Sequence, residues 1–213
     1  MNAPSSARGF TLIEVLLATV LLAAGMALAF AAVRSTMAIS ARGEVIAADN
    51  ERMRAVEGFL RRRLATAMAL PMQRDALSGT ATVFSGDARE LRFVAEVPDY
   101  LGRGGPYVHA LEVTGSGEQQ ELRIGLLLLQ SGQPIEETPP RGSELLADGL
   151  KQVRLRYRGI DPATGSLGNW QERWELPGRM PLLVSIEIVP ARGAAWPPLL
   201  VALPQQNQPG SWQ

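Results

Sequence analysis

Side chains that could do acid–base or metal chemistry are few in this chain of 213 residues, which has one histidine and no cysteine. Without cysteine there is no thiolate nucleophile, no thiolate metal ligand and no disulfide. The single histidine, His109, alternates with Tyr107 and Leu111 as on a strand, and no serine or carboxylate pairs with it at a catalytic spacing. We therefore expect His109 to be a structural residue, buried or half-buried, and the protein not to be an enzyme.

Other patterns resemble binding sites only superficially. The segment Gly102-Arg103-Gly104-Gly105 lacks the strand-to-helix context and the Lys-Ser/Thr ending of a phosphate loop, which favours a flexible turn. Glu136, Glu137 and Asp161 do not form the run of oxygen ligands that Ca²⁺ needs. The 21 Lys+Arg residues balance 21 Asp+Glu, so nothing attracts nucleic acid in general. We expect no metal, no cofactor, no nucleic acid and no small-molecule substrate.

One carboxylate, that of Glu14, lies inside an apolar segment, where a charge is unfavourable. An apolar segment covers residues 10–33, and Glu14 is its only charged residue. About 24 residues of helix reach roughly 36 Å, enough to cross a hydrocarbon core of about 30 Å. A carboxylate in such a segment is costly unless another group compensates its charge. We predict a partner charge, supplied when the chain assembles with copies of itself or its relatives.

Three interpretations of this N-terminal stretch compete. It is a plain membrane anchor, or a secretory signal cut after Ala29 or Ala31, where small residues follow the apolar core. In the third interpretation a leader (residues 1–9) is removed by cleavage between Gly9 and Phe10, and the apolar helix is kept. A carboxylate this early in the apolar core, and a helical pattern that continues past Ala31, favour the third.

The helix is expected to continue beyond the apolar segment as an amphipathic half, over residues 34–71. Apolar residues there recur at intervals of three and four, at Met53, Val56, Leu60 and Leu64, with Phe59 beside them. Arg61, Arg62 and Arg63 indicate a solvated face, and Pro71 provides a stop. Together these features predict one helix of about 60 residues, roughly 90 Å long if straight.

From about Gln73 the apolar pattern alternates, which predicts a β-rich domain over residues 72–204 and a flexible tail over residues 205–213. The predicted strands are 91–95, 107–114, 121–130, 151–157, 170–176, 182–189 and 199–203. A hairpin is expected at Gly115-Ser116-Gly117, a loop at 131–141 and a turn at 161–165. Arg154, Arg156 and Arg158 are expected on an exposed face. The fold class is α+β, with the sheet packed on the C-terminal half of the helix.

Two stretches of the sequence resemble one family. Gly9-Phe10-Thr11-Leu12-Ile13-Glu14 resembles the processing motif of type IV pilins and pseudopilins. The C-terminal part resembles the J-type minor pseudopilin of type II secretion (general secretion pathway protein J). The residues that carry this second resemblance are Leu145–Leu150, Arg154–Tyr157, Trp170, Trp174, Leu176-Pro177, Met180-Pro181 and Leu183–Glu187.

The resemblance implies a type IV pilin-like fold and a non-enzymatic filament subunit. It implies cleavage before Phe10 and N-methylation of Phe10 by the prepilin peptidase, and a single pass through the bacterial inner membrane with the C-terminal domain in the periplasm. It also implies partnership with I-type and K-type minor pseudopilins in a tip complex that primes a pseudopilus and helps export folded proteins. The alternatives are a minor pilin of a type IV pilus, or a membrane-anchored periplasmic domain of other function.

Within that family the K-type subunit commonly lacks the acid that Glu14 provides here, which fits a cap with no subunit above it. Retention of Glu14 therefore implies a position just below the cap. The amine of mature Phe10, still charged after a single methylation, is the expected partner of the Glu14 carboxylate, on the same chain or on a neighbouring one.

Overall fold

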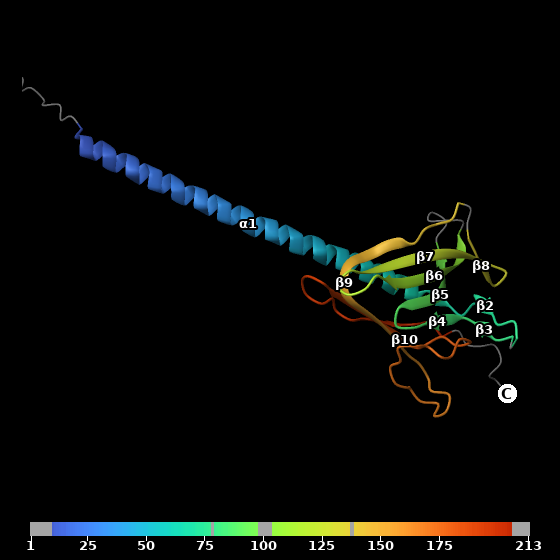
Figure 1. The fold of residues 1–213 in the computed structure, drawn as a ribbon. Helices are drawn as coiled ribbons and strands as arrows, with labels where there is room; N and C mark the ends of the chain where they lie inside the picture. The colour runs from blue at the N-terminus through green and yellow to red at the C-terminus, as the bar shows by residue number, and fades with distance from the viewer. Residues whose placement is uncertain (1–9, 78, 98–103, 137–138, 206–213) are drawn as a thin grey trace, which may run out of the picture. The chain divides into compact units, whose positions relative to one another are not determined.

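The computed structural model (Figure 1) describes residues 10–77, 79–97, 104–136 and 139–205. The expected leader and the last eight residues of the expected tail lie outside the described residues, as do Gly102, Arg103 and Glu137. The chain divides into two compact units, Met1–Arg52 and Met53–Gln213, and each is described by itself.

Helix α1 (Leu12–Ala65) supplies the first unit and the beginning of the second. It starts where the Thr11 carbonyl accepts hydrogen bonds from the backbone N–H groups of Glu14 (3.0 Å) and Val15 (3.3 Å). Thr11 and Glu14 have the Thr-x-x-Glu spacing of a capping box, a common signal for a helix N-terminus. The segment Leu12–Met37 has a mean hydropathy of 2.4, and none of it is buried within the chain.

Helix α1 ends at Ala65, six residues before Pro71, so the predicted stop at Pro71 was wrong. The Thr66 hydroxyl donates to the carbonyl oxygens of Arg62 and Arg63, both at 3.1 Å, which closes the last turn. Strand β1 (Ala67–Met68) then pairs with the main sheet. Strand pairing, and not proline, therefore ends the helix.

The last turns of α1 pack on one face of an antiparallel sheet. Val56, Leu60 and Leu64 are 6%, 2% and 0% exposed, so the predicted helical phase is confirmed. They belong to a core that also contains Phe84, Tyr157 and other sheet residues. The stripe at intervals of three and four thus forms the contact between helix and sheet.

The main sheet has nine strands, with a central order β1-β5-β6-β7-β9-β10-β11; β4 also pairs with β5, and β8 with β7. The bounds of the remaining strands are β4 (Phe84–Gly86), β5 (Glu90–Val97), β6 (Gly105–Thr114), β7 (Gln120–Gln130), β8 (Gln133–Ile135), β9 (Glu144–Arg158), β10 (Leu183–Pro190) and β11 (Leu199–Ala202). Strands β2 (Gln73–Arg74) and β3 (Ala81–Thr82) form a separate pair.

Six of the seven predicted strands are present, as β5, β6, β7, β9, β10 and β11. The hairpin between β6 and β7 is confirmed, and Gly115 and Gly117 there take positive φ angles of 75° and 60°. The predicted loop at 131–141 contains the short strand β8, which pairs with the end of β7. The turn at 161–165 is confirmed by a hydrogen bond from the Gly165 N–H to the Asp161 carbonyl (2.8 Å).

The strand predicted at 170–176 was wrong. Only Gln171 pairs there, in an isolated bridge with Tyr157. The Trp174 indole N–H lies within hydrogen-bonding distance of the carbonyl oxygens of Leu176 (2.9 Å) and Arg179 (2.8 Å), so the chain curls around the ring. A buried indole N–H needs a hydrogen-bond acceptor, and here the acceptors are carbonyls of its own segment, which favours an irregular segment over an extended strand.

Strand β9 changes partner along its length, pairing with β7 at its start and with β10 beyond Leu150. Gly149 lies at the change with φ at +60°, a conformation that favours glycine. The segment Leu145–Leu150 is therefore a bend within one strand.

A second, smaller core lies on the other face of the sheet. Met72, Val94, Val108 and Leu129 are buried there, with Leu127 packed against them. Because Leu122 and Ile124 face the first core, β7 is covered on both sides.

Candidate functional site

The sequence predicts roles in processing for Gly9 and Phe10 and a role in assembly for Glu14. Of these three residues, Phe10 and Glu14 lie on the same side of the first turns of α1. They line an apolar groove of about 330 Å³ together with Val15, Ala18, Thr19 and Leu22. Phe10 precedes the helix and is 84% exposed. Gly9, on the other side of the predicted cleavage point, lies outside the described residues.

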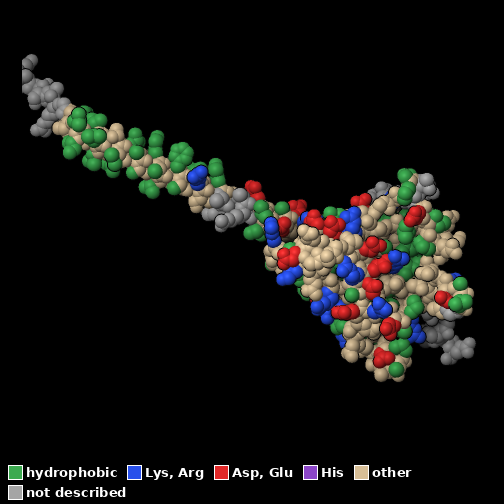
Figure 2. All heavy atoms as spheres, viewed as in Figure 1, with side chains coloured by type: hydrophobic (Ala, Val, Ile, Leu, Met, Phe, Trp, Pro, Cys, Tyr) green, Lys and Arg blue, Asp and Glu red, His purple; other side chains and the backbone are tan. Residues whose placement is uncertain are grey.

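The apolar surface that surrounds Glu14 is continuous. Figure 2 shows apolar side chains along this part of α1, and every residue from Phe10 to Met37 is exposed. At about 1.5 Å per residue, the 26 residues Leu12–Met37 span about 39 Å, longer than a hydrocarbon core of about 30 Å. Apolar surface of this extent requires lipid or the helices of neighbouring subunits.

The Glu14 carboxylate occupies the first turn of α1, at the positive end of the helix dipole. Its position suits it to meet a cation at this end of the helix, and Phe10 would carry one if its amine were free. Sequence reasoning proposed Phe10 and Glu14 as functional residues, and it missed Thr11, whose carbonyl begins the helix. The Thr-x-x-Glu spacing is the signal that could have found it.

His109, on β6, is fully buried in the second unit. Its ring stacks on Phe93, with centroids 5.1 Å apart, and its Nδ1–H donates to the Tyr107 carbonyl at 3.1 Å. Burial lowers the pKa of His109 from 6.5 to about 4; the hydrogen bond to Tyr107 opposes this, and the Arg63 charge adds to it. The predicted burial is confirmed.

Arg154, Arg156 and Arg158 were predicted on an exposed face, but other side chains of the domain cover part of that face. Glu187 on β10 pairs with Arg156, and lies 3.9 Å from Arg154. Arg156 and Arg158 lie over the Trp170 ring, at 5.7 and 5.9 Å from its centroid. Arg156 and Arg158 are half-buried, and only Arg154 is exposed.

The remaining carboxylates considered from the sequence do not converge in the part of the chain that the structure describes. Glu136 is exposed, and the Asp161 side chain accepts a hydrogen bond from the Ala163 N–H at 2.8 Å within its own turn. Among the described residues no three His, Cys, Asp or Glu side chains come together as a metal site.

A long apolar N-terminal helix whose end packs on an antiparallel sheet defines a type IV pilin-like subunit. The sequence agrees in two separate parts. Residues 4–30 match the prokaryotic N-terminal methylation motif, and residues 31–199 match the family described as type II secretion system (T2SS), protein J.

A curated relative extends this match to nearly the whole chain. The type II secretion system protein J of Xanthomonas campestris pv. campestris is 56% identical over 205 residues, which are 96% of this chain and 97% of the relative. A solved structure, the GspK-GspI-GspJ complex of the enterotoxigenic Escherichia coli type 2 secretion system, contains a chain similar at 15% identity. The TM-score is 0.49, over 74% of this chain and 98% of that one.

The chain belongs to the type II secretion system protein J family. It is a minor pseudopilin of type II secretion, a structural subunit, so the alternative of a type IV pilus is set aside. With its apolar N-terminal helix, it is a single-pass protein of the bacterial inner membrane whose C-terminal domain lies in the periplasm.

Proposed function

We propose that this protein is cut between Gly9 and Phe10, N-methylated at Phe10, and then inserted below the cap of a pseudopilus tip complex with I-type and K-type minor pseudopilins. In that position it primes the pseudopilus and helps to export folded proteins, without catalysis of its own. The observation that carries the proposal is the exposed apolar segment Leu12–Met37 with one carboxylate in its first turn.

The proposed cleavage point would keep the whole apolar helix. A cut after Ala29 or Ala31 would remove most of the apolar segment and leave α1 without its exposed apolar surface. A cut before Phe10 keeps the surface whole and places a new amine four residues from Glu14. Within about one turn of helix these two charges can attract each other in a low-dielectric surrounding.

The partner assignment is supported by what the printed title of the similar solved structure says of that assembly, which joins GspK, GspI and GspJ. A buried carboxylate without a partner charge is unfavourable, so an ion pair with a Phe10 amine favours one axial register between neighbouring helices. The non-catalytic part of the proposal is supported by a sequence with one histidine and no cysteine.

Mass spectrometry of the mature protein tests the processing. We expect a chain that begins with monomethylated Phe10. A chain that begins at Phe30 or Ala32, or that keeps Met1, would contradict it.

Cross-linking in cells tests the role of Glu14. Glu14→Ala and Glu14→Val should be cut at Gly9 like the wild type but lose cross-links to the I-type and K-type subunits, and secretion should fall. Glu44→Ala, an exposed carboxylate of the same helix outside the apolar segment, is the matched control and should behave as the wild type. Wild-type cross-linking and secretion by the Glu14 variants would refute the ion pair. A hydrolase screen on the purified protein tests the absence of catalysis.

A further inference from the structure

The outer face of strand β9 carries a row of three arginines. Leu155 and Tyr157 are fully buried in the first core, so the residues that alternate with them, Arg154, Arg156 and Arg158, share the opposite face of the strand. Alternate residues of a strand lie about 7 Å apart, so the row extends over about 14 Å. In a chain whose formal net charge is zero, the row concentrates positive charge at one place.

The charge of this row is only partly compensated. Glu187 on β10 is the one carboxylate that pairs with it among the described residues, and it bonds to Arg156 and lies 3.9 Å from Arg154. Arg158 donates from Nε to a neutral group, the Gly168 carbonyl, at 2.7 Å. Three guanidinium groups therefore share one carboxylate, and the row attracts further negative charge.

The Trp170 ring holds two of the three arginines in place. The guanidinium carbons of Arg156 and Arg158 lie 5.7 and 5.9 Å from the centroid of the ring, within the range of a cation–π contact. Arg156 is also fixed by Glu187, and Arg158 by Gly168. These two guanidinium groups are thus restrained before any partner arrives.

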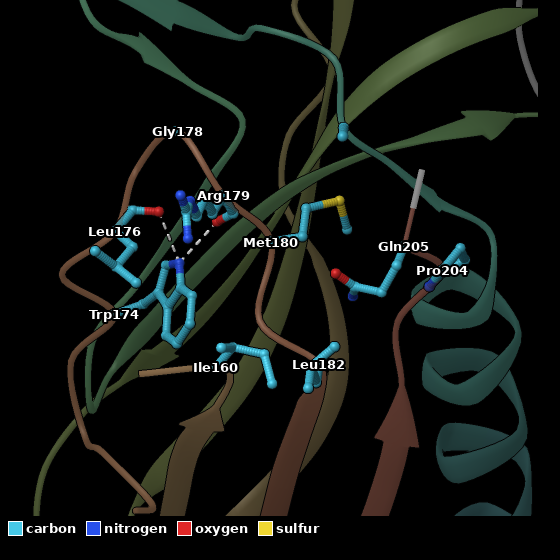
Figure 3. Close-up of a pocket in the computed structure, with 10 residues that line it drawn as sticks. Ile160, Trp174, Leu176, Gly178, Arg179, Met180, Leu182, Pro204 and Gln205 are labelled. Carbon is cyan, nitrogen blue, oxygen red and sulfur yellow. Dashed lines mark hydrogen bonds between the residues drawn. The ribbon is translucent and has the colours of Figure 1, made fainter. Parts of the chain in front are cut away.

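The segment that carries Trp170 is itself anchored. Gln171 and Tyr157 exchange two backbone hydrogen bonds, of 2.8 and 2.9 Å. The Trp174 indole N–H donates to the carbonyls of Leu176 and Arg179 in the same segment (Figure 3). Because the ring is held, the arginines that lie over it are pre-organised, and binding of an anion costs little side-chain entropy.

We propose that this arginine row binds an acidic segment of a partner protein, which places carboxylates on Arg154 and Arg158. The Arg154 side chain is 44% exposed, so a partner can reach the row. Guanidinium groups bind carboxylates with two parallel hydrogen bonds. Carboxylates at alternate positions of an extended segment also repeat at about 7 Å, so such a segment matches the period of the row. This surface is separate from Glu14, and the proposal does not depend on assembly through the apolar helix.

The geometry favours a polypeptide over an anionic membrane surface. A membrane attracts clusters of Lys and Arg through their summed charge, without requiring fixed positions. Here Glu187, Gly168 and Trp170 hold the guanidinium groups at fixed points of a rigid strand. Donors at fixed points suit acceptors that are also spaced regularly, as on a polypeptide.

Fluorescence anisotropy of a labelled peptide tests the binding. The probe is a short peptide in which glutamate and threonine alternate, added to the full chain in non-ionic detergent micelles. We expect saturable binding, about tenfold tighter than that of the same peptide with glutamine in place of glutamate. Equal binding of the two peptides would overturn the proposal. Displacement of the acidic peptide by phosphatidylglycerol mixed into the micelles would assign the row to lipid headgroups and overturn it too.

A matched pair of variants shows whether the row itself is responsible. Arg154 and Arg92 each lie on a strand beside one glutamate, with side chains 44% and 48% exposed. Strands β6 and β7 separate β5, which carries Arg92, from β9 in the sheet. Arg154→Gln should weaken binding of the acidic peptide about tenfold, because it removes one charged donor, and Arg92→Gln should not. Equal affinities of the two variants would refute the proposal. The comparison of the two peptides on the unsubstituted protein covers a variant that does not fold.

Photo-cross-linking in cells extends the test to the natural partner. Gln152, exposed on β9 two residues before Arg154, is replaced by p-benzoyl-phenylalanine, which leaves the arginines intact. We expect adducts on a segment of another protein that is rich in Asp and Glu. Arg154→Gln should abolish these adducts, and Arg92→Gln should leave them unchanged. Adducts that persist with Arg154→Gln, or that map to segments without acidic residues, would count against the proposal.

Discussion

The buried histidine predicts a measurable pH dependence of stability. The Nδ1–H of His109 is committed to the Tyr107 carbonyl, and Nε2 has no hydrogen-bond partner among the described protein groups. A second proton would go to Nε2, where the folded protein offers it no acceptor. The pKa of His109 therefore falls from 6.5 to about 4, mainly because of burial; the hydrogen bond to Tyr107 opposes this, and the Arg63 charge makes the smallest contribution.

The sign follows from which state binds the proton. Between pH 6.5 and about 4 the unfolded chain takes up a proton on His109 that the folded protein does not, so acid favours unfolding. At about 1.4 kcal/mol for each pH unit, this gap corresponds to about 3 kcal/mol. The contribution of neutral His109 is fully present above pH 6.5, falls as the pH is lowered, and is lost near pH 4.

Urea unfolding of the full chain in detergent, followed by tryptophan fluorescence, measures this effect. His109→Phe keeps a ring against Phe93 but cannot titrate, and it leaves the Tyr107 carbonyl without its donor. We expect the free energy of unfolding of the variant to be about 1 kcal/mol lower than that of wild type at pH 7. Between pH 7 and pH 4 the wild type should lose about 3 kcal/mol more than the variant, because only the wild type has a histidine at this position to titrate. Carboxylate titration affects both proteins alike and cancels in the difference.

Arg63→Gln provides the control for charge. The Arg63 guanidinium is the smallest of the three causes that act on the His109 pKa, so removing it should leave most of the pH dependence in place. The reasoning is refuted if the stabilities of wild type and His109→Phe run parallel from pH 7 to pH 4.

Three further changes test the packing of the sheet domain. Leu60→Ala should cost about 2–5 kcal/mol in urea unfolding, because Leu60 is 2% exposed; an unchanged midpoint would show that this face of α1 is not core. A Cβ on Gly86 would lie 2.3 Å from the Tyr157 ring, so Gly86→Ala should cost about 1–3 kcal/mol, whereas Gly142→Ala, with open space around it, should cost little. Deletion of residues 1–39 should leave a folded, monomeric domain by sedimentation; an insoluble product would show that α1 contacts the sheet only within a complex.

The regular elements could be predicted because their patterns extend over several periods. The stripe of Val56, Leu60 and Leu64 set the helical phase. Alternation along β6 predicted one face of that strand, on which Tyr107, His109, Leu111 and Val113 are all buried. Strands β1 to β4 were missed because two or three residues are too few to show alternation. Their pairing depends on neighbours far away in the sequence, such as Met68 with Val94.

The errors came from tertiary contacts that outweighed local pattern. Trp170, Trp174 and Leu176 have strand spacing, but Trp174 is held by two carbonyls of its own segment while Trp170 lies beside Arg156. For the functional site, Phe10 and Glu14 followed from a local motif. The surfaces that meet other subunits did not, because they depend on shapes that only the partners define.

The position of Glu14 decides when its charge matters. In a membrane, a carboxylate in the first turn of α1 lies near the interface, where it costs less than the about 2.5–3.5 kcal/mol of a central position. The helix dipole offsets about 0.3–1 kcal/mol of that cost. In the proposed pseudopilus the same carboxylate is surrounded by apolar helices and has no access to the interface, so the dipole alone is insufficient. The need for a Phe10 amine therefore arises on assembly, and it is strongest in the one helix register that brings the two charges together.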